Sequence, residues 1–168
     1  MEQTAKAPLG HRLYPSLLDR LTDNAPDVKE EPPEHRVLRA AQLRAGVLRD
    51  LVWLLNTVRP DDDALAAVAQ VRQSVLNYGL PALSGQSLAN LQARDMERAI
   101  HDAIVCFEPR IDAATLSVTL LRSADMTHHQ HVGFEIRGQL WSHPYPVELL
   151  LKTQLDVECG EFRLDDER

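Results

Sequence analysis

The order of apolar and polar residues divides the chain into a helical first part and a strand-like second part. Apolar residues recur every three or four positions over residues 34–57 and 86–107, which predicts two long amphipathic helices, and an alanine-rich stretch over 64–76 predicts a shorter one between them. The expected core stripes are Leu38, Ala41, Ala45, Leu48, Val52 and Leu55 in the first long helix, and Leu88, Leu91, Ala99, Ile100, Ala103, Ile104 and Phe107 in the second.

Beyond Pro109 the apolar period changes to two, which indicates β-strands. Three strands are expected, around Leu116, Val118 and Leu120, then Phe134, Ile136 and Leu140, then Leu149, Leu151, Thr153, Leu155 and Val157, with a short fourth over 161–164. We expect Gly138 to form a bulge that resets the alternation. Short connections favour an antiparallel meander. The predicted fold class is therefore α+β, with N-terminal helices packed on one face of a small antiparallel C-terminal sheet of three to four strands.

Residues 1–34 are expected to form an N-terminal arm, and residues 35–168 a single domain. The arm contains a short helix within residues 11–24 that carries Leu17, Leu18 and Leu21, followed by a proline-bearing polar linker over 25–34. A helix of this length is not stable alone in water, so it must dock on its own domain or on a partner. The sequence leaves both possibilities open.

Composition excludes several classes of protein. The 168 residues carry a formal net charge of −7, which argues against nucleic-acid binding, because neutralising phosphates needs a basic face. No apolar run approaches the ~20 residues of a membrane span, and the first ten residues lack the apolar core of a signal peptide, so we expect a cytoplasmic protein with no membrane insertion. Cys106 and Cys159 match no metal-ligand spacing and are expected to be buried thiols.

The sequence contains little that would indicate a metal site, a cofactor site or a catalytic nucleophile. Asp61, Asp62 and Asp63 are best interpreted as an acidic helix cap, and the histidines at 128, 129, 131 and 143 as part of a polar loop. There is neither a Gly-x-Ser-x-Gly elbow nor a glycine-rich phosphate loop. Trp53 and Trp141 are expected in the core or at an interface. We therefore expect no cofactor and no metal.

Glycoside hydrolysis is the serious enzymatic alternative, because it requires only two suitably spaced carboxylates. The chain supplies several, namely Glu97, Asp102, Glu108, Glu135, Glu148 and Asp156. Any acidic domain does so, and a sequence cannot give the separation of ~5 to 9 Å between carboxyl groups that the chemistry needs.

The stretch Phe107-Glu108-Pro109-Arg110-Ile111 lies where the helical pattern stops and the strand pattern begins. Proline cannot continue a helix and pushes the residue before it into an extended conformation, so the helix should end near Phe107. Glu108 and Arg110 are thereby held in a fixed relation that suits ion pairing. Two interpretations remain: an internal pair that fixes the corner between helix and sheet, or a charged surface for a partner.

This stretch and its neighbours resemble the TssE family of type VI secretion systems, which is related to the lysozyme-like wedge protein of contractile phage baseplates. The similarity extends in order over residues 13–160. The segments that carry it are Leu18-Asp19-Arg20-Leu21, Arg49-Asp50-Leu51, Leu54-Leu55-Asn56-Thr57, Ser74-Val75-Leu76-Asn77-Tyr78-Gly79-Leu80-Pro81, Phe107-Glu108-Pro109-Arg110-Ile111, Phe134-Glu135-Ile136 and Thr153-Gln154-Leu155-Asp156.

The resemblance implies a baseplate subunit of a contractile injection machine, located in the cytoplasm against the inner membrane complex. It implies assembly without catalysis, in which the chain joins other wedge subunits and offers strands on which sheath subunits begin to polymerise. Glu108, Pro109 and Arg110 would contact the core of the wedge. The alternatives are a peptidoglycan-cleaving lysozyme-like hydrolase and a cytoplasmic adaptor unrelated to secretion.

The predicted sheet permits such assembly on physical grounds as well. An open antiparallel meander has edge strands, and the unpaired main-chain groups of an edge can accept a strand from another protein. We expect the C-terminal strands to recruit sheath subunits in this way, with partner contacts at Thr153, Leu155 and Val157.

Overall fold

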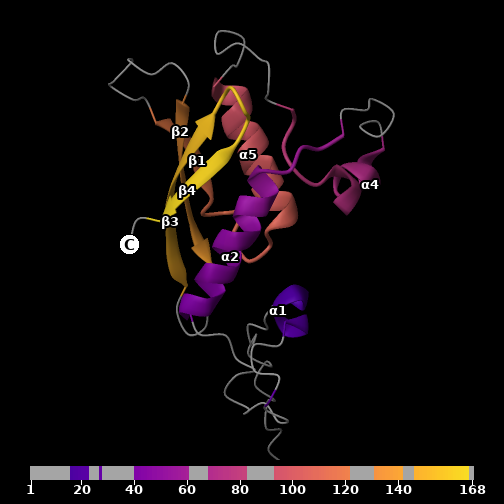
Figure 1. Cartoon of the computed structure of the whole chain (residues 1–168), viewed down its shortest axis with the longest axis vertical. Helices are drawn as coiled ribbons and strands as arrows, with labels where there is room; N and C mark the ends of the chain where they lie inside the picture. Colours follow the sequence, from indigo (N-terminus) through magenta and orange to yellow (C-terminus); the bar gives the residue numbers. More distant parts are fainter. Residues whose placement is uncertain are drawn as a thin grey trace, which may run out of the picture.

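The computed structural model describes residues 16–22, 27, 40–60, 68–82, 93–121, 131–141 and 146–166. A four-stranded antiparallel sheet forms one layer, and two long helices cover one of its faces (Figure 1). This confirms the expected α+β class. The helical segments are α1 (Leu17–Leu21), α2 (Ala40–Leu55), α4 (Ala69–Arg72), the 3-10 turn η2 (Val75–Asn77) and α5 (Ala93–Phe107), and the strands are β1 (Ser117–Leu121), β2 (His131–Leu140), β3 (Val147–Asp156) and β4 (Phe162–Asp166).

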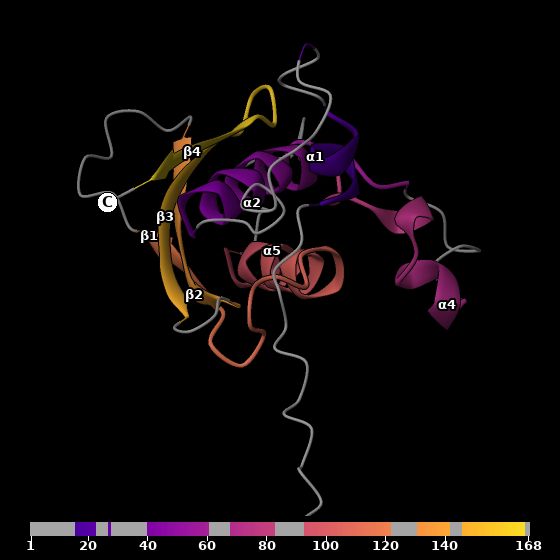
Figure 2. The ribbon, with the colours of Figure 1, turned by 90° about the horizontal axis from the view of Figure 1, so that it is seen from below.

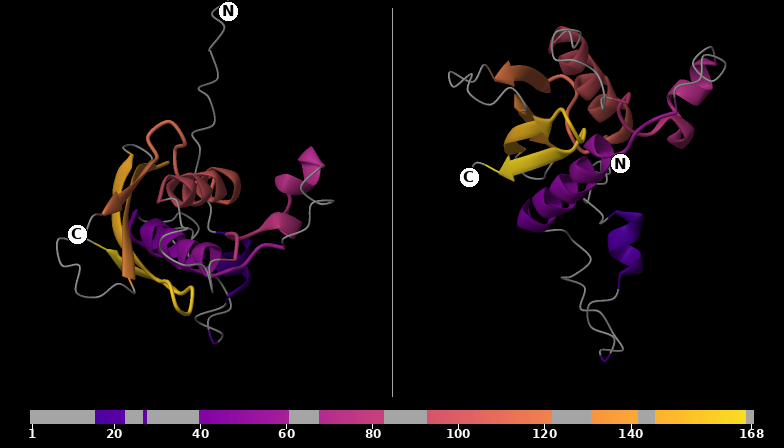
Figure 3. Two further views of the ribbon diagram at one scale, coloured as in Figure 1. Left: turned by 90° about the horizontal axis from the view of Figure 1, so that it is seen from above. Right: turned by 45° about the horizontal axis from the view of Figure 1, so that its top comes forward.

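The four strands follow one another in the order β1-β2-β3-β4, so the predicted meander is confirmed. Alternate side chains of each strand point toward the helices, and Phe134, Ile136 and Leu140 of β2 are fully buried. The sheet curves around α2 and α5, which lie side by side on its concave face (Figures 2 and 3). The hydrophobic core fills the space between these two layers.

The buried stripe of α2 differs from the predicted one. The fully buried hydrophobic residues are Leu43, Val47, Leu51, Leu54 and Leu55. Of the predicted stripe, Leu55 is in the core and Leu48 packs against it, whereas Ala41, Ala45 and Val52 are exposed and Leu38 lies outside the described residues. Leucine and valine occur nearly all round this helix, so more than one chain of three- and four-residue steps can be drawn through it. In α5 the expected Ile100, Ala103 and Ile104 are buried, and Met96 joins them.

Gly138 does not form the expected bulge, because the pairing of β2 with β3 runs without interruption from His131 to Leu140. Gly138 faces inward in step with its neighbours. A Cβ atom there would lie 3.1 Å from Cγ2 of Ile111. The glycine therefore provides room for Ile111, which follows the corner after α5. In the sequence, a glycine inside a strand looks like a break in the alternation, which is why a bulge was predicted.

Both outer strands of the sheet are held by side chains from the flanking helices. On β4, the side-chain amide of Asn56 donates to the Phe162 carbonyl at 3.0 Å and its oxygen accepts from the Phe162 N–H at 2.8 Å. On β1, Glu97 of α5 accepts from the Leu120 N–H at 2.6 Å. Arg44 of α2 donates to the Glu148 carbonyl of β3 at 2.7 Å. Polar side chains of α2 and α5 thus fix the helices to the rim of the sheet as well as to its face.

The segment between α2 and α5 is tied back to the end of α2. Leu80 N–H donates to the Thr57 carbonyl and Arg59 N–H to the Leu80 carbonyl, both at 2.8 Å. Gly79 has a φ of +112°, and a Cβ there would lie 2.2 Å from the Thr57 oxygen, so only glycine fits. Three predicted features lie outside the described residues: the cap at Asp61–Asp63, the linker over 25–34 apart from residue 27, and the histidines at 128, 129 and 143.

Candidate partner-binding site

The stretch after α5 forms a rigid corner. The helix ends at Phe107 as predicted, with a final bond from the Glu108 N–H to the Ile104 carbonyl at 2.8 Å. The Trp141 N–H donates to the Arg110 carbonyl at 2.9 Å, and Ile111 forms an isolated bridge with Leu140. The corner is thereby fixed to the end of β2.

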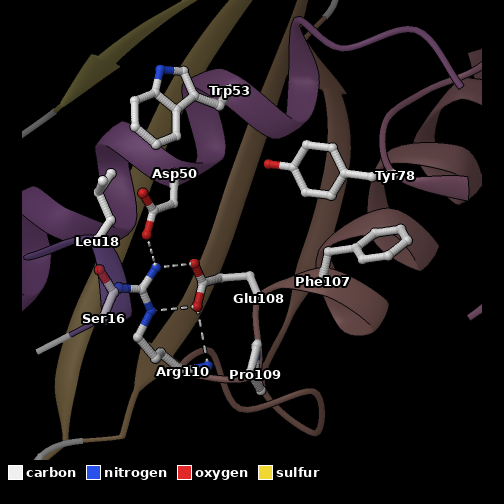
Figure 4. Close-up of a pocket in the computed structure, with 9 residues that line it drawn as sticks. All are labelled: Ser16, Leu18, Asp50, Trp53, Tyr78, Phe107, Glu108, Pro109 and Arg110. Carbon is white, nitrogen blue, oxygen red and sulfur yellow. Dashed lines mark hydrogen bonds and ion pairs between the residues drawn. The ribbon is translucent and has the colours of Figure 1, made fainter. Parts of the chain in front are cut away.

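Glu108 and Arg110 form an ion pair within the chain. The Arg110 Nε donates to Glu108 Oε1 at 2.6 Å, and its Nη2 bonds to Glu108 Oε2 (Figure 4). The Arg110 N–H adds a third bond to Oε1 at 3.2 Å. Glu108 is only 3 % exposed. Of the two interpretations of this motif, the internal pair is therefore present, and a bidentate pair of this kind is geometrically specific.

The pair belongs to a longer chain of charges. Asp50 of α2 accepts from Arg110 Nη2 at 2.5 Å and lies 2.8 Å from Arg49 Nη2, and Arg49 Nη1 bonds to Asp19 of α1 at 2.5 Å. Burial opposes the charge of Arg110, but its bonds to Glu108 and Asp50 outweigh that effect and raise its pKa. Five charged side chains, from α1, α2 and the corner after α5, form one network.

Helix α1 docks on its own domain through polar contacts. Ser16 caps the helix by accepting from the Asp19 N–H at 3.2 Å, and Asp19 pairs with Arg49. Leu17 and Leu21 are 70 % and 74 % exposed. Helix α1 thus docks internally through its polar side chains, with Leu17 and Leu21 facing outward.

Beside the network lies a hollow of about 360 Å³. Its aromatic walls are Trp53, Tyr78 and Phe107, and the other residues that line it are Ser16, Leu18, Asp50, Glu108, Pro109 and Arg110. Tyr78 directs its hydroxyl toward the carboxylates (Figure 4), and burial together with the charges of Asp50 and Glu108 raises its pKa. The hollow combines aromatic surface with excess negative charge.

The residues expected to make edge-strand contacts do not lie on an edge of the sheet. Thr153, Leu155 and Val157 belong to β3 or the turn after it, their side chains are buried, and β3 pairs with β2 on one side and β4 on the other. The strands with an open side are β1 and β4 instead. A period-two pattern identifies a strand but not its neighbours, so the sequence could not locate the edge.

Catalytic and metal chemistry gain no support in the described part of the chain. Asp50 and Glu108 both bond to the Arg110 guanidinium, whereas glycoside hydrolysis needs one carboxyl group that donates a proton. None of the described residues form a group of three or more metal-ligating side chains. Both cysteines are free, but Cys159 is exposed and Cys106 half-buried, contrary to the expected burial.

Comparison with known families matches residues 41–145, well over half of the chain, to the family described as baseplate wedge protein gp25. The chain belongs to this family. The matched segment includes the Glu108–Arg110 corner, Asp50 and the aromatic walls of the hollow, whereas the residues that α1 and its cap contribute to the site lie before it. Searches of curated proteins and of solved structures gave no match.

Membership of the gp25 family assigns a structural role in a contractile machine, with contacts to other baseplate components. It favours a protein without enzymatic activity. Among the described helices, none has the length and apolar character to cross a membrane.

Several residues of the site were not predicted from the sequence. Three of them, Asp19, Arg49 and Asp50, belong to helices far from the corner in sequence. In the sequence, each one alone is indistinguishable from an ordinary surface charge. All three do stand in segments that resemble the TssE family, which is the signal in the sequence that could have found them. Trp53 and Trp141 were expected in the core or at an interface, and at 48 % and 60 % exposure they are not in the core.

Proposed function

We propose that the chain is a structural subunit of a type VI secretion baseplate wedge, which joins other wedge proteins and helps to start assembly of the contractile sheath without catalysing a reaction. Family membership supports the wedge role, and the TssE-like segments support the type VI assignment. The protein would act in the cytoplasm, at a baseplate docked on the inner membrane.

The observation that carries the proposal is the surface around the charged corner. The Glu108–Arg110–Asp50 network is held rigidly between α2, α5 and β2, while Trp53 and the leucines of α1 remain exposed beside it. Large aromatic residues and arginine supply much of the binding energy at protein interfaces, and Trp53 is such a residue exposed beside this centre, with the leucines of α1 adding apolar surface. Glu108, Pro109 and Arg110 would then serve the wedge contact by shaping this surface.

The test is capture of the other wedge proteins by the full chain. A double variant, Leu17→Ser with Leu21→Ser, alters only exposed leucines beside the site and should lower capture at least about tenfold, as loss of interface core residues does. The matched control is Val75→Ser with Leu76→Ser, an exposed apolar pair on η2, which should capture wedge proteins normally. Equal capture by both double variants would contradict a wedge contact at this surface.

The free side of β4 supports a role in sheath assembly. The Phe162 N–H and C=O point away from β3, because Asn56 binds both of them. Main-chain groups alternate in direction along a strand, so those of Leu164 point the same way, and no partner for them lies among the described residues. We infer that a sheath strand adds to β4 beyond Phe162, rather than at the buried Thr153, Leu155 and Val157.

A proline substitution can test this edge directly. Among main-chain groups, Leu164→Pro removes only an N–H that points outward, so the ladder to β3 should survive. The leucine side chain, which packs against the core, is lost as well. Leu164→Ala shortens the same side chain and keeps the N–H. We expect sheath subunits to polymerise on the alanine variant and not on the proline variant. Polymerisation on a folded proline variant would contradict strand addition at this position.

A further inference from the structure

The hollow beside the charged corner has walls from three separate parts of the chain. Trp53 comes from α2, Tyr78 follows η2, and Phe107 ends α5. Tyr78 and Phe107 meet edge to face, with ring centroids 5.2 Å apart and planes at 68°, which fixes both rings. At about 360 Å³ the space is at the small end of ligand pockets, and it suits one side chain better than a whole small molecule.

Negative charge exceeds positive charge at this place. The charged groups that line the hollow are the carboxylates of Asp50 and Glu108 and the single guanidinium of Arg110. Arg49 and Asp19, the next two members of the network, cancel one another. The raised pKa of Tyr78 has both carboxylates among its causes after burial, so their potential reaches the hydroxyl at the wall. The site carries one net negative charge, which favours a cation.

The aromatic walls favour the same kind of ligand. A guanidinium or ammonium group binds the face of a tryptophan or tyrosine ring and buries its apolar stem at the same time. Trp53 already does this within the chain, because the Arg49 guanidinium lies 5.2 Å from its ring centroid. The ring is nevertheless 48 % exposed, so it retains surface for a second cation.

We propose that this hollow accepts an arginine side chain from a partner protein of the wedge. The planar guanidinium would bond to the partly exposed Asp50 and stack against Trp53, while its stem packs on Phe107 and Pro109. The buried Glu108 would contribute its negative charge without a direct bond. The inference rests on the proposed function, because a partner must face this surface. It adds the chemistry of the contact: the partner contributes the cation, and this chain contributes the carboxylates and the aromatic walls.

The direct test uses a minimal probe, N-acetylarginine methylamide, titrated into the full chain while the indole N–H signals of the two tryptophans are followed by NMR. We expect saturable shifts at Trp53, with weak affinity, and none at Trp141, which is exposed but outside the hollow. The matched control ligand is N-acetylcitrulline methylamide, which has nearly the same shape without the charge. Equal shifts from the citrulline compound would overturn the proposal, because recognition would then not depend on a cation.

Two variants locate the binding. Trp53→Ala removes an exposed ring and should leave the fold intact while weakening arginine binding at least about fivefold, as expected for loss of a cation–π contact. Because the Trp53 indole is absent from this variant, its affinity is followed by the backbone amide shifts of Phe107 and Arg110, which line the same hollow. Trp141→Ala is the control and should bind the probe like the unaltered chain. Unchanged affinity in Trp53→Ala would place the cation elsewhere and overturn the proposal.

The same probe separates this inference from the proposed function. If wedge proteins bind the chain and the arginine compound displaces them while the citrulline compound does not, both hold. If wedge proteins bind but Trp53→Ala captures them normally and the arginine compound does not compete, the wedge role stands and the arginine contact is overturned. If no wedge protein binds the unaltered chain, the proposed function fails and the identity of the partner fails with it, whatever the probe does.

Discussion

Replacing Arg110 by alanine should destabilise the fold more than replacing Glu108, although the two side chains form one ion pair. In Arg110→Ala, the Glu108 carboxylate stays buried and keeps only the N–H of residue 110 as a donor, and Asp50 also loses a bond. Removing one partner of a buried pair costs about 3–5 kcal/mol, because the other charge is left uncompensated. In Glu108→Ala, Arg110 loses its bonds to Glu108 but keeps Asp50 and is partly open to water, which can replace part of the loss. We therefore expect a smaller cost of about 1.5–3 kcal/mol, the scale of one hydrogen bond to a charged group.

The double variant is the sharper measurement. With both residues changed to alanine no uncompensated charge remains at position 108, so the combined loss should be smaller than the sum of the two single losses by about 1–3 kcal/mol. Guanidinium unfolding followed by circular dichroism gives the free energy of unfolding for the four proteins, and an unchanged denaturant slope shows that only the native state was altered.

Two results would refute the reasoning. One is an Arg110→Ala variant as stable as Glu108→Ala, which would mean that water reaches Glu108 when the arginine is absent. The other is strict additivity in the double variant, which would mean that the two charges do not depend on one another. If the expected order is found, a loss of partner binding in Arg110→Ala cannot be assigned to the interface alone, and the exposed residues of α1 and Trp53 are the better probes of binding.

Three further outcomes follow from the structure. Gly79→Ala should lose more than about 1 kcal/mol, because its Cβ would lie 2.2 Å from the Thr57 carbonyl at a positive φ, and an unchanged unfolding midpoint would contradict that contact. Asn56→Ala should cost about 1 kcal/mol and speed hydrogen exchange at the Phe162 amide, whereas unchanged exchange would count against the clamp. The pKa of Asp19 lies below its ordinary 3.8, chiefly through its bond to an arginine, so the docking of α1 should be complete above that pH and lost below the lowered pKa. Release of α1 near neutral pH, seen in amide chemical shifts, would refute the assignment of its docking to ionised Asp19.

The fold could be predicted largely from local pattern. The period-two runs after Pro109 gave the strands, and their short connections gave the order β1-β2-β3-β4. The end of α5 at Phe107 followed from the proline two residues later. These features depend on residues close in sequence, and so a single sequence contains the information.

The predictions that were wrong concern features set by contacts between residues distant in sequence. The buried face of α2 could not be identified, because apolar residues surround it and only the sheet and α5 select which of them face inward. Gly138 looked like a break in a strand, whereas its position is set by Ile111 on a different element. The leucines of α1 indicated that the helix docks but not where, and the contact is made by Asp19 with Arg49 while Leu17 and Leu21 stay exposed.

For the site, the sequence supplied the centre and not its surroundings. Glu108 and Arg110 stood out because a proline fixes them in relation to one another. Asp50, Trp53 and Tyr78 reach the same place from α2 and from the segment after η2, and nothing in their local spacing indicates that they converge. The aromatic and acidic character of the hollow therefore emerges only in three dimensions.

The side chains that bind the outer strands of the sheet also limit self-association of the protein. An open edge pairs with any exposed strand, including that of a second identical molecule, and so invites aggregation. Asn56 and Glu97 each occupy main-chain groups on the outer strands, and Arg44 takes a carbonyl on β3 beyond the end of β4. Among the described residues the free length of β4 is thereby short, which disfavours pairing between two free copies. The proposed sheath strand would differ because its own assembly would already hold it in place. Removing these three side chains should therefore favour self-association before it favours unfolding.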